Sequence, residues 1–469
     1  MTDFASLLHP DRGEPAHRLA PVAADGFDAW LKDQPAQVRA LAEAGRFRAK
    51  PGELLILPGR KDGEWSAAFG RAKAPGPWDI AAIAQKLPAG TYRIDAEDSG
   101  QGGDDHLSGA LGWLLAHHRF DRYLAKPDPI PARVLLTRDA AAIAPTVALA
   151  EAVALVRDLV DTPAADMGPA ELADAAEAVA KAHGAEFRVT RGDALDQGYP
   201  MIAAVGRAAI RERAPRLIEI EWGDPAHPRV AIVGKGVCFD SGGLDIKPSS
   251  AMLLMKKDMG GAAHALALAG LVMGARLPVR LHLLIPAVEN AVAGDAFRPG
   301  DILRSRKGLS VEIGNTDAEG RLVLGDALAR AGEDKPALIL DFATLTGAAR
   351  VALGPDLPAM FANDDALAAD LLAAAAAVSD PVWRMPLWAD YAEMIKSTTA
   401  DINNAGEGGM AGAVTAALFL QRFVPDSTPW AHFDTFAWRP SARPGRPKGG
   451  DALGLRAAFA MLKAKFVTP

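Results

Sequence analysis

The chain has 469 residues, of which 49% are hydrophobic and 23% are charged, and its formal net charge is −7. This length is enough for roughly two or three domains with a sizeable core. The mildly acidic balance argues against a surface for nucleic acid or anionic membranes. Cys238 is the only cysteine, so an internal disulfide is excluded, which fits a reducing cytosol.

The N-terminus has no basic segment leading into an apolar one, so it does not resemble a signal peptide. The most apolar stretches are short and alanine-rich, and none is expected to reach the roughly 20 residues of a membrane span. We therefore expect a cytoplasmic protein without a membrane or nucleic-acid partner.

Residues 1–138 are predicted to form a smaller N-terminal α/β domain. Two short apolar runs, residues 54–57 and 134–137, have the character of strands. The prolines of KPDPIP, residues 126–131, disfavour helix in the residues before them and so mark a domain boundary. A long helical pattern over about 140–160 is expected to open a larger C-terminal domain, residues 139–469.

Beyond residue 160, apolar β-rich runs alternate with alanine-rich helical runs. This alternation predicts an α/β domain whose central, largely parallel sheet is flanked by helices. The expected strands are residues 216–222, 229–233, 280–285 and 337–342, and the expected helices are residues 260–274, 321–331 and 411–423.

Charged residues gather in three short segments where hydrophobic patterning would not place them. The first, VGKGVCFDSGG at 233–243, carries Lys235 and Asp240 and is expected to be a loop after a buried strand. Loops at the carboxyl ends of strands form the ligand crevice of α/β sheets. The second segment, residues 246–265, carries Lys247 and Asp258. Capping of the helix that follows is the alternative role for Asp258.

The third segment, NTDAEGRLVLGDALA at 315–329, carries Asp317, Glu319 and Arg321. On extended backbone, side chains two residues apart point to the same side, so the two carboxylates can act together. A solvated capping cluster is the alternative. Four gathered carboxylates need cations, because like charges held close drive one another to protonate. Carboxylate oxygens suit hard or borderline divalent ions, and a pair of such ions needs a bridging carboxylate.

Histidine is missing from these segments apart from His264, which follows the second and is expected to be a packed residue of the core or behind the site. A mononuclear zinc site with histidine ligands is therefore not expected.

The three segments resemble the leucyl aminopeptidase family, also called cytosol aminopeptidases or peptidase family M17. The family's hallmark NTDAEGR is present unchanged at 315–321. The VGKG, FDSGG, IKP and MK-x-DM-x-GAA segments match in the family's order and close to its spacing, and RDLVDTP, TLTGA and AGAVTAALFL are flanking matches. The resemblance covers about residues 150–435 and is weak over the first 138.

The resemblance implies an aminopeptidase that acts on peptides with two divalent ions, zinc or manganese, in each subunit. It assigns the tightly bound ion to Lys235, Asp240, Asp258 and Glu319, and the exchangeable ion to Asp240, Asp317 and Glu319. It assigns catalysis to Lys247 and Arg321, with bicarbonate held by Arg321 as the base. It also implies a homohexamer whose active sites face an interior cavity.

The chemistry of these residue types agrees with the implied roles. A water that bridges two cations loses a proton near neutral pH and becomes a nucleophile. Lys247 would stabilise the oxyanion of the tetrahedral intermediate, and the planar Arg321 suits a small carboxylate-like anion. Lys235 can ligate a metal only as a neutral amine, which requires a pKa well below about 10.4.

The pocket for the N-terminal side chain is implied to contain Met255, Asn315, Thr344 and Gly347. The family's strand near the C-terminus normally reads His-Leu-Asp-Ile-Ala-Gly, whereas this chain reads HFDTFAW at 432–438, which puts Phe436 at the position of the alanine. An aromatic ring there is expected to disfavour large N-terminal residues. The alternative is a shifted register in which Phe436 packs in the core.

Three other residues depart from the family pattern and make substrate preference harder to infer. Lys257 stands where an aromatic residue is usual, Asp161 where asparagine is common, and Glu407 in a stretch with a different glycine-rich sequence in the family.

Three other functions fit parts of the pattern. DSGG at 240–243 resembles the nucleophile segment of trypsin-like serine proteases, but alternating strands and helices do not fit their paired β-barrels. GKG after a strand suggests nucleotide binding, but neither glycine-rich phosphate-binding pattern fits around Gly234. The third is a scaffold without activity, and the presence of every expected ligand and both catalytic residues argues against it.

Overall fold

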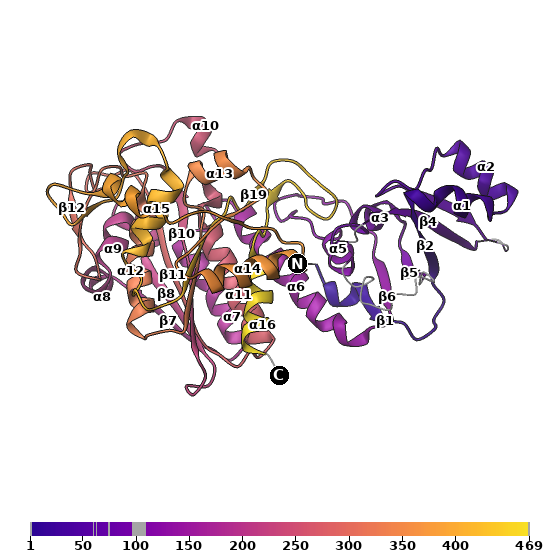
Figure 1. Ribbon diagram of the computed structural model, residues 1–469, viewed down its shortest axis with the longest axis horizontal. Helices are drawn as coiled ribbons and strands as arrows, with labels where there is room; N and C mark the ends of the chain where they lie inside the picture. Colours follow the sequence, from indigo (N-terminus) through magenta and orange to yellow (C-terminus); the bar gives the residue numbers. More distant parts are fainter. Residues whose placement is uncertain (1, 60, 62, 74–75, 96–108, 468–469) are drawn as a thin grey trace. The chain divides into compact units, whose positions relative to one another are not determined.

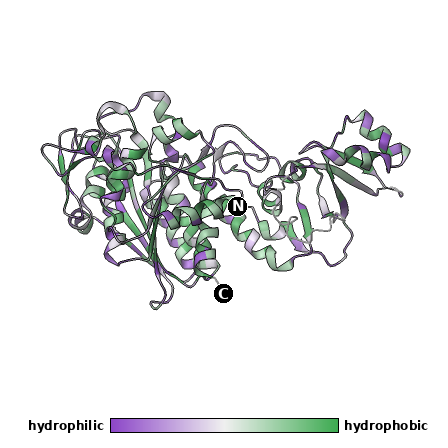
Figure 2. Ribbon diagram, in the orientation of Figure 1, coloured by the Kyte–Doolittle hydropathy of each residue, from purple (hydrophilic) through white to green (hydrophobic). Residues whose placement is uncertain are grey.

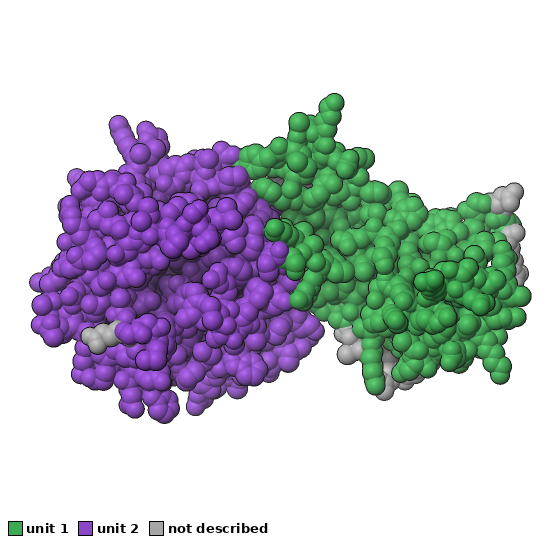
Figure 3. Space-filling view, turned by 90° about the horizontal axis from the view of Figure 1, so that it is seen from above, with its two compact units in different colours: residues 1–154, 441–448 green, residues 155–440, 449–469 purple. Residues whose placement is uncertain are grey.

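The computed structural model describes residues 2–59, 61, 63–73, 76–95 and 109–467. Its contacts divide the chain into two compact units: residues 1–154 with 441–448, and residues 155–440 with 449–469 (Figures 1 and 3). Each unit is built around its own sheet with helices, so the predicted α/β class is confirmed. The contacts divide the chain within the predicted linker helix, and the domain boundary at 138/139 stays a prediction.

The first unit contains a six-stranded sheet. Its strands are β1 (Leu8–Pro10), β2 (His17–Ala23), β3 (Leu54–Pro58), β4 (Trp65–Arg71), β5 (Gly90–Ile94) and β6 (Arg133–Thr137). Its helices are α1 (Phe27–Lys32), α2 (Ala36–Ala44), α3 (Ala81–Lys86) and α5 (Ala110–Leu115). The strand order is β1-β6-β5-β2-β4-β3, and every pair is parallel except β3 with β4. The two strands expected here from sequence are β3 and β6.

The helical pattern expected over about 140–160 is helix α6 (Ile143–Asp161), preceded by a short 3-10 turn. By length and composition, Ala140–Asp161 could cross a membrane, so the expectation that no segment reaches this length is wrong. A buried helix of a soluble protein can have the same length and composition. In this helix, 44% of an apolar 18-residue window is buried. Arg157 of α6 is fully buried and forms an ion pair with Asp451 at 3.1 Å, so this part of the helix packs inside the second unit.

The second unit contains a nine-stranded sheet. Its strands are β7 (Glu186–Arg191), β8 (Arg216–Trp222), β9 (Arg229–Gly234), β10 (Gly236–Asp240), β11 (Arg280–Asn290), β14 (Leu338–Ala343), β15 (Ala359–Ala362), β16 (Trp383–Arg384) and β18 (Trp430–Asp434). The order is β16-β15-β18-β14-β9-β11-β8-β7, and β10 also pairs with β11. The central strands β18, β14, β9 and β11 run parallel, which confirms the largely parallel sheet. The smaller sheets are β12 (Ile302–Arg304) with β13 (Ser310–Glu312) and β17 (Ile402–Asn403), and β19 (Trp438–Arg439) with β20 (Gly449–Gly450).

Helices cover both faces of the large sheet (Figure 1). The helices described in this unit are α7 (Pro169–Ala182), α8 (Asp193–Gly198), α9 (Pro200–Gly206), α10 (Ser249–Met252), α11 (Gly260–Gly274), α12 (Glu319–Glu333), α13 (Gly347–Leu353), α14 (Asp365–Ala377), α15 (Gly412–Gln421) and α16 (Leu455–Phe466). Helices α9, α12 and α15 share one core with strand residues such as Val233, Leu284 and Ile339. Helix α11 is hydrophobic on all sides, as a fully buried helix must be (Figure 2).

The helices and strands expected beyond residue 160 are present within a few residues of their predicted bounds, except that β11 continues to Asn290. The loop expected over 233–243 is wrong, because β10 occupies its middle. Lys235 interrupts the strand because its place in the register is opposite Pro286 of β11, and proline has no amide hydrogen for the ladder. On its other side, the amide of Lys235 donates to the carbonyl of Phe342 on β14 at 2.9 Å, which continues the β9–β14 ladder.

Candidate active site

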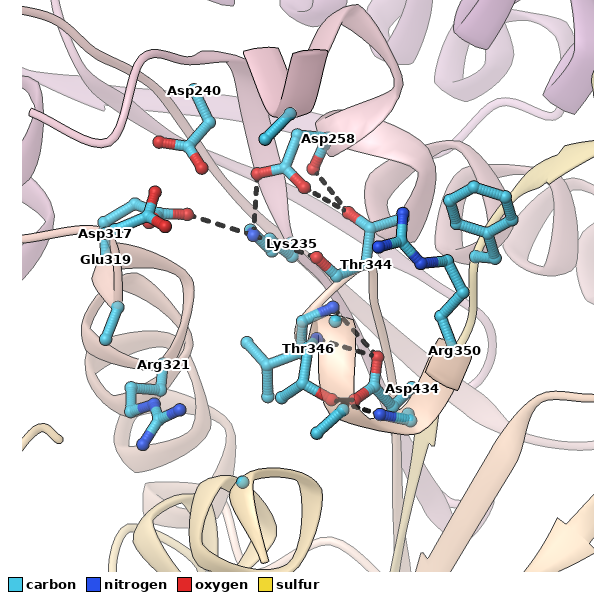
Figure 4. Close-up of a pocket in the computed structure, with 18 of the residues that line it drawn as sticks. Lys235, Asp240, Asp258, Asp317, Glu319, Arg321, Thr344, Thr346, Arg350 and Asp434 are labelled. Carbon is cyan, nitrogen blue, oxygen red and sulfur yellow. Dashed lines mark hydrogen bonds and ion pairs between the residues drawn. The ribbon is translucent and has the colours of Figure 1, made fainter. Parts of the chain in front are cut away.

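A pocket of about 650 Å³ lies in the second unit. Part of its wall comes from the carboxyl ends of strands (Figure 4). Lys235 follows β9, Asp240 ends β10, Thr344 follows β14 and Asp434 ends β18. The carboxyl ends of parallel strands are where α/β sheets bind their ligands.

The structure brings the five predicted metal ligands together in this pocket. Carboxylate oxygens of Asp240, Asp317 and Glu319 lie within 4.8 Å of one another. The Lys235 ammonium joins them to Asp258, because its Nζ lies 2.7 Å from Asp258 Oδ2 and 3.0 Å from Glu319 Oε1 (Figure 4). We call these four carboxylates the acidic cluster.

Asp317 and Glu319 reach the acidic cluster by a route that differs from the expected one. The backbone is not extended there, since Asp317 lies in a turn and Glu319 is the first residue of α12. The Asp317 amide donates to Asn315 Oδ1 at 2.7 Å, which closes the turn. A solvated capping cluster is also wrong, because Glu319 is 1% exposed.

Asp258 is held by Thr344, which follows strand β14, and does not cap a helix. It lies in a 3-10 turn (Met255–Met259) just before α11, whose N-cap residue Met259 provides no side-chain hydrogen bond. The Thr344 hydroxyl donates to Asp258 Oδ1 at 2.9 Å. The capping alternative for Asp258 is therefore wrong.

Two glycines leave the space that the charged side chains occupy. A Cβ on Gly320 would meet Cε of Lys235 at 2.5 Å, so the lysine reaches the cluster only by passing over a bare helix backbone. Gly242 has φ +88°, which favours glycine, and a Cβ there would lie 3.0 Å from Asp317 Oδ1.

The two lysines of the cluster are held in their charged forms. Burial alone would lower the pKa of Lys235, but Asp258 and Glu319 outweigh burial and raise it above its ordinary value. Lys247 behaves in the same way. Burial lowers its pKa, but the Asp240 carboxylate, 2.8 Å away, and the other nearby carboxylates of the cluster together raise the pKa above its ordinary value. Lys247 also forms an ion pair with Asp317. In the structure, both lysines therefore act as counterions of the cluster.

The carboxyl groups are left short of positive charge even so. Burial, together with the nearby Asp240, raises the pKa of Glu319 to about 8 and that of Asp317 to about 6. Oε2 of Glu319 is buried and accepts no hydrogen bond from the described residues, and buried polar atoms rarely remain without a partner. Four carboxylates and an amine form a donor set suited to borderline divalent ions. The residues present therefore fit a divalent metal centre.

Arg321 lies away from the lysine–carboxylate contacts (Figure 4). It is the third residue of α12 and is 9% exposed, with its guanidinium 6.0 Å from the ring centroid of Phe419. Burial lowers its pKa to about 10, so it stays charged at neutral pH. Its Nε and Nη1 are buried and donate no hydrogen bond within the described part of the chain. Arg321 can therefore hold a small anion.

The residues predicted for the side-chain pocket line the same cavity: Met255, Asn315, Thr344, Gly347 and Phe436. Phe436 is half-buried on the pocket wall, not packed in the core.

Sequence reasoning missed two residues that hold this site in place. Asn290 donates to Asp240 Oδ1 at 2.9 Å, and Asp434 accepts from the Thr346 hydroxyl at 2.6 Å. Each ends a strand of the central sheet, and that position was the available signal.

Ser241 and His264 have structural roles. The Ser241 hydroxyl donates to the carbonyl of Asn290 at 2.7 Å, and no described histidine contacts it, so the serine-protease interpretation lacks its base. His264 is fully buried, and its Nε2 accepts from the amide of Leu453 at 2.9 Å.

Known families and structures resemble the chain over nearly its whole length. The model of the cytosol aminopeptidase family, catalytic domain, matches residues 154–459, and that of the M17 aminopeptidase N-terminal domain matches residues 18–136. A probable cytosol aminopeptidase of Geobacter sulfurreducens is 38% identical over 98% of this chain and 87% of its own. One of Syntrophotalea carbinolica is 42% identical over 75% of this chain and 73% of its own.

Two solved structures share the fold. The crystal structure of the cytosol aminopeptidase from Coxiella burnetii has a TM-score of 0.93 at 44% identity, covering 98% of this chain and 99% of its own. The bottromycin maturation enzyme BotP in complex with Mn has a TM-score of 0.86 at 33% identity, covering 96% of this chain and 100% of its own.

Proposed function

The chain belongs to the cytosol aminopeptidase family, a family of metal-dependent peptidases, and on that premise we propose how its site hydrolyses the N-terminal peptide bond of peptides. The observation that carries the proposal is the acidic cluster, in which four carboxylates meet two lysines in one pocket. Such a cluster is costly unless it binds cations.

We assign two divalent ions to this cluster, zinc or manganese. The ligands of one would be Lys235, Asp240, Asp258 and Glu319, and those of the other would be Asp240, Asp317 and Glu319. Manganese is supported by the complex of BotP with Mn. When bound, such ions would polarise a carbonyl and lower the pKa of a bound water. Cations would also take over the neutralising role of Lys235 and so allow it to become a neutral ligand.

Lys247 is assigned to the oxyanion of the tetrahedral intermediate. It stands at the edge of the cluster, with its side chain 12% exposed, and its raised pKa keeps it charged. A fixed ammonium stabilises charge that develops as the peptide carbonyl is attacked. Lys247 would therefore act more strongly in the transition state than on the bound peptide.

Arg321 is assigned to a small carboxylate-like anion, bicarbonate, which would serve as the base. The support is its buried guanidinium with two unpartnered nitrogens. A planar guanidinium binds a carboxylate-like anion through parallel hydrogen bonds. Its role is to position that base.

The N-terminal side chain of the peptide is assigned to the wall formed by Met255, Asn315, Thr344, Gly347 and Phe436. All five line the cavity that contains the acidic cluster. The N-terminal residue can therefore lie beside the cluster while its side chain contacts this wall.

The proposal is tested with purified protein, alanyl and leucyl p-nitroanilides, and the same substrates with an acetylated amine. We expect hydrolysis of the free-amine substrates only, loss with a chelator and recovery with Mn²⁺ or Zn²⁺. Equal hydrolysis of the acetylated substrates would exclude an aminopeptidase. Full activity in chelator, with no metal found by elemental analysis, would exclude the metal centre.

We also propose that the chain assembles as a homohexamer, on the strength of its family alone. Light scattering during size-exclusion chromatography measures the molar mass of the assembly directly. A monomeric mass at micromolar concentration would contradict it.

A further inference from the structure

Two cations that the proposed mechanism does not use stand on the pocket wall. Lys257 Nζ lies 5.3 Å from the ring centroid of Phe436, and the guanidinium carbon of Arg350 lies 5.2 Å from the same centroid. All three residues line the cavity that contains the acidic cluster. An aromatic ring attracts a cation through its quadrupole but carries no net charge. Phe436 therefore positions the two cations without neutralising them.

Lys257 is buried with incomplete compensation. Its side chain is 7% exposed, and its one ion pair with a described residue is to Asp258 Oδ1 at 3.8 Å, beyond hydrogen-bonding distance. Asp258 is already engaged by Lys235 at 2.7 Å and by the Thr344 hydroxyl at 2.9 Å. An ammonium group removed from water without a close partner is unfavourable.

The remaining charges of the pocket wall do not supply the missing partner. Asp434 is occupied by the Thr346 hydroxyl at 2.6 Å and by the amides of Leu345 and Thr346. Arg350 is exposed, and within the described part of the chain its guanidinium forms no ion pair and no hydrogen bond. This part of the wall therefore carries two cations that have no close anionic partner among the described residues.

We infer that the pocket selects peptides whose N-terminal residue is acidic, with the side-chain carboxylate of glutamate or aspartate received by Lys257 and Arg350. This inference rests on the proposed aminopeptidase function and names its substrate class. The ring of Phe436 narrows the pocket for large apolar side chains. Charge and shape therefore both favour a short acidic residue over leucine or phenylalanine.

The test compares glutamyl and glutaminyl p-nitroanilides, which differ in charge but hardly in shape. We expect the kcat/KM of the wild type to be about 10-fold higher or more for the glutamyl than for the glutaminyl substrate. The reason is that the desolvated ammonium of Lys257 attracts only the charged side chain. In Lys257→Met, the glutamyl kcat/KM should fall about 10- to 100-fold, while that of the alanyl substrate stays within about threefold.

The matched control is Lys256→Met, which removes the same charge one residue away. Lys256 lies over the ring of Trp438 and does not line the cavity, so its variant should keep the wild-type preference. Arg350→Glu is the second variant that tests the inference. It is suitable because an exposed arginine can be replaced without disturbing the core. It should lower glutamyl hydrolysis and raise lysyl hydrolysis, each several-fold.

A glutamyl-to-glutaminyl ratio near one in the wild type would overturn the inference, as would a ratio that both Lys257→Met and Arg350→Glu leave unchanged. Alanyl hydrolysis in the same assays shows that the proposed function still holds. If the metal-loaded protein hydrolyses no substrate, the proposed function fails, and calorimetry with L-glutamate and L-glutamine tests the pocket by itself. Preferential binding of L-glutamate supports the inference, and equal or absent binding of both amino acids overturns it.

Discussion

Lys235 and Lys247 contact the same acidic cluster, but their surroundings differ in exposure. On the Lys235 side, the side chains of Lys235, Asp258 and Glu319 are 3%, 4% and 1% exposed. On the Lys247 side, Lys247 is 12% and Asp317 is 32% exposed. Solvent reaches the second side more readily, so an ion held there would exchange more easily. The contrast gives a physical reason for the proposal of one tightly bound and one exchangeable ion.

The largest effect is expected from the residues that join the two sides. Asp240→Ala and Glu319→Ala should each abolish activity and lower the metal content, because both carboxylates are assigned to both ions. Elemental analysis and peptidase assays measure this. Two metal ions per chain in either variant would show that the two sides do not share these ligands.

A change on the exposed side alone should separate the two ions. Asp317→Ala removes a carboxylate assigned only to the exchangeable ion, so dialysed protein should retain about one ion per chain and lose most of its activity. Asp258→Ala is the matched change on the buried side and should deplete the tightly bound ion. Equal metal loss in the two variants would contradict the difference between the sides.

The next largest effect is expected from residues assigned to catalysis and not to metal binding. Lys247→Ala should keep two ions but lose about 10²-fold in turnover, the usual effect of removing an oxyanion-stabilising group. Arg321→Ala should be milder, because water or another anion can partly replace the positioned base. Wild-type turnover in Lys247→Ala would rule out the assigned role.

The smallest effect is expected from Phe436, which belongs to neither side of the cluster. Phe436→Ala should raise kcat/KM about 10-fold for leucyl and phenylalanyl substrates relative to alanyl, because it opens an overfilled pocket. The metal content should not change, since Phe436 is not an assigned ligand and its ring lies against the cations of Lys257 and Arg350. An unchanged ranking of substrates in soluble, metal-loaded protein would contradict the blocked pocket.

The segments that form the site could be found in the sequence because each places charge beside glycine at the end of an apolar run. Helix α11 and strand β8 have their predicted bounds, since their hydrophobic patterns are local. The interruption at Lys235 could not be predicted, because it depends on Pro286 in another strand. The grouping of Lys257, Arg350 and Phe436 has the same origin, since only the fold brings these three positions together.

In the first unit, strand β4 shows why much of the smaller sheet was not expected. Its sequence WSAAFGR does not alternate regularly between apolar and polar residues, although its burial is set by the strands on either side. Pairing across the sheet therefore decides its structure more than its own pattern does.

The passage of Lys235 over Gly320 limits how this sequence can evolve. Even alanine at position 320 would bring a methyl group within 2.5 Å of the lysine side chain. The helix could accept that methyl group by itself, and would gain helix propensity from it. Natural variants and active members of directed-evolution libraries should therefore retain glycine at 320 wherever they retain Lys235. The two positions are expected to be conserved or changed together.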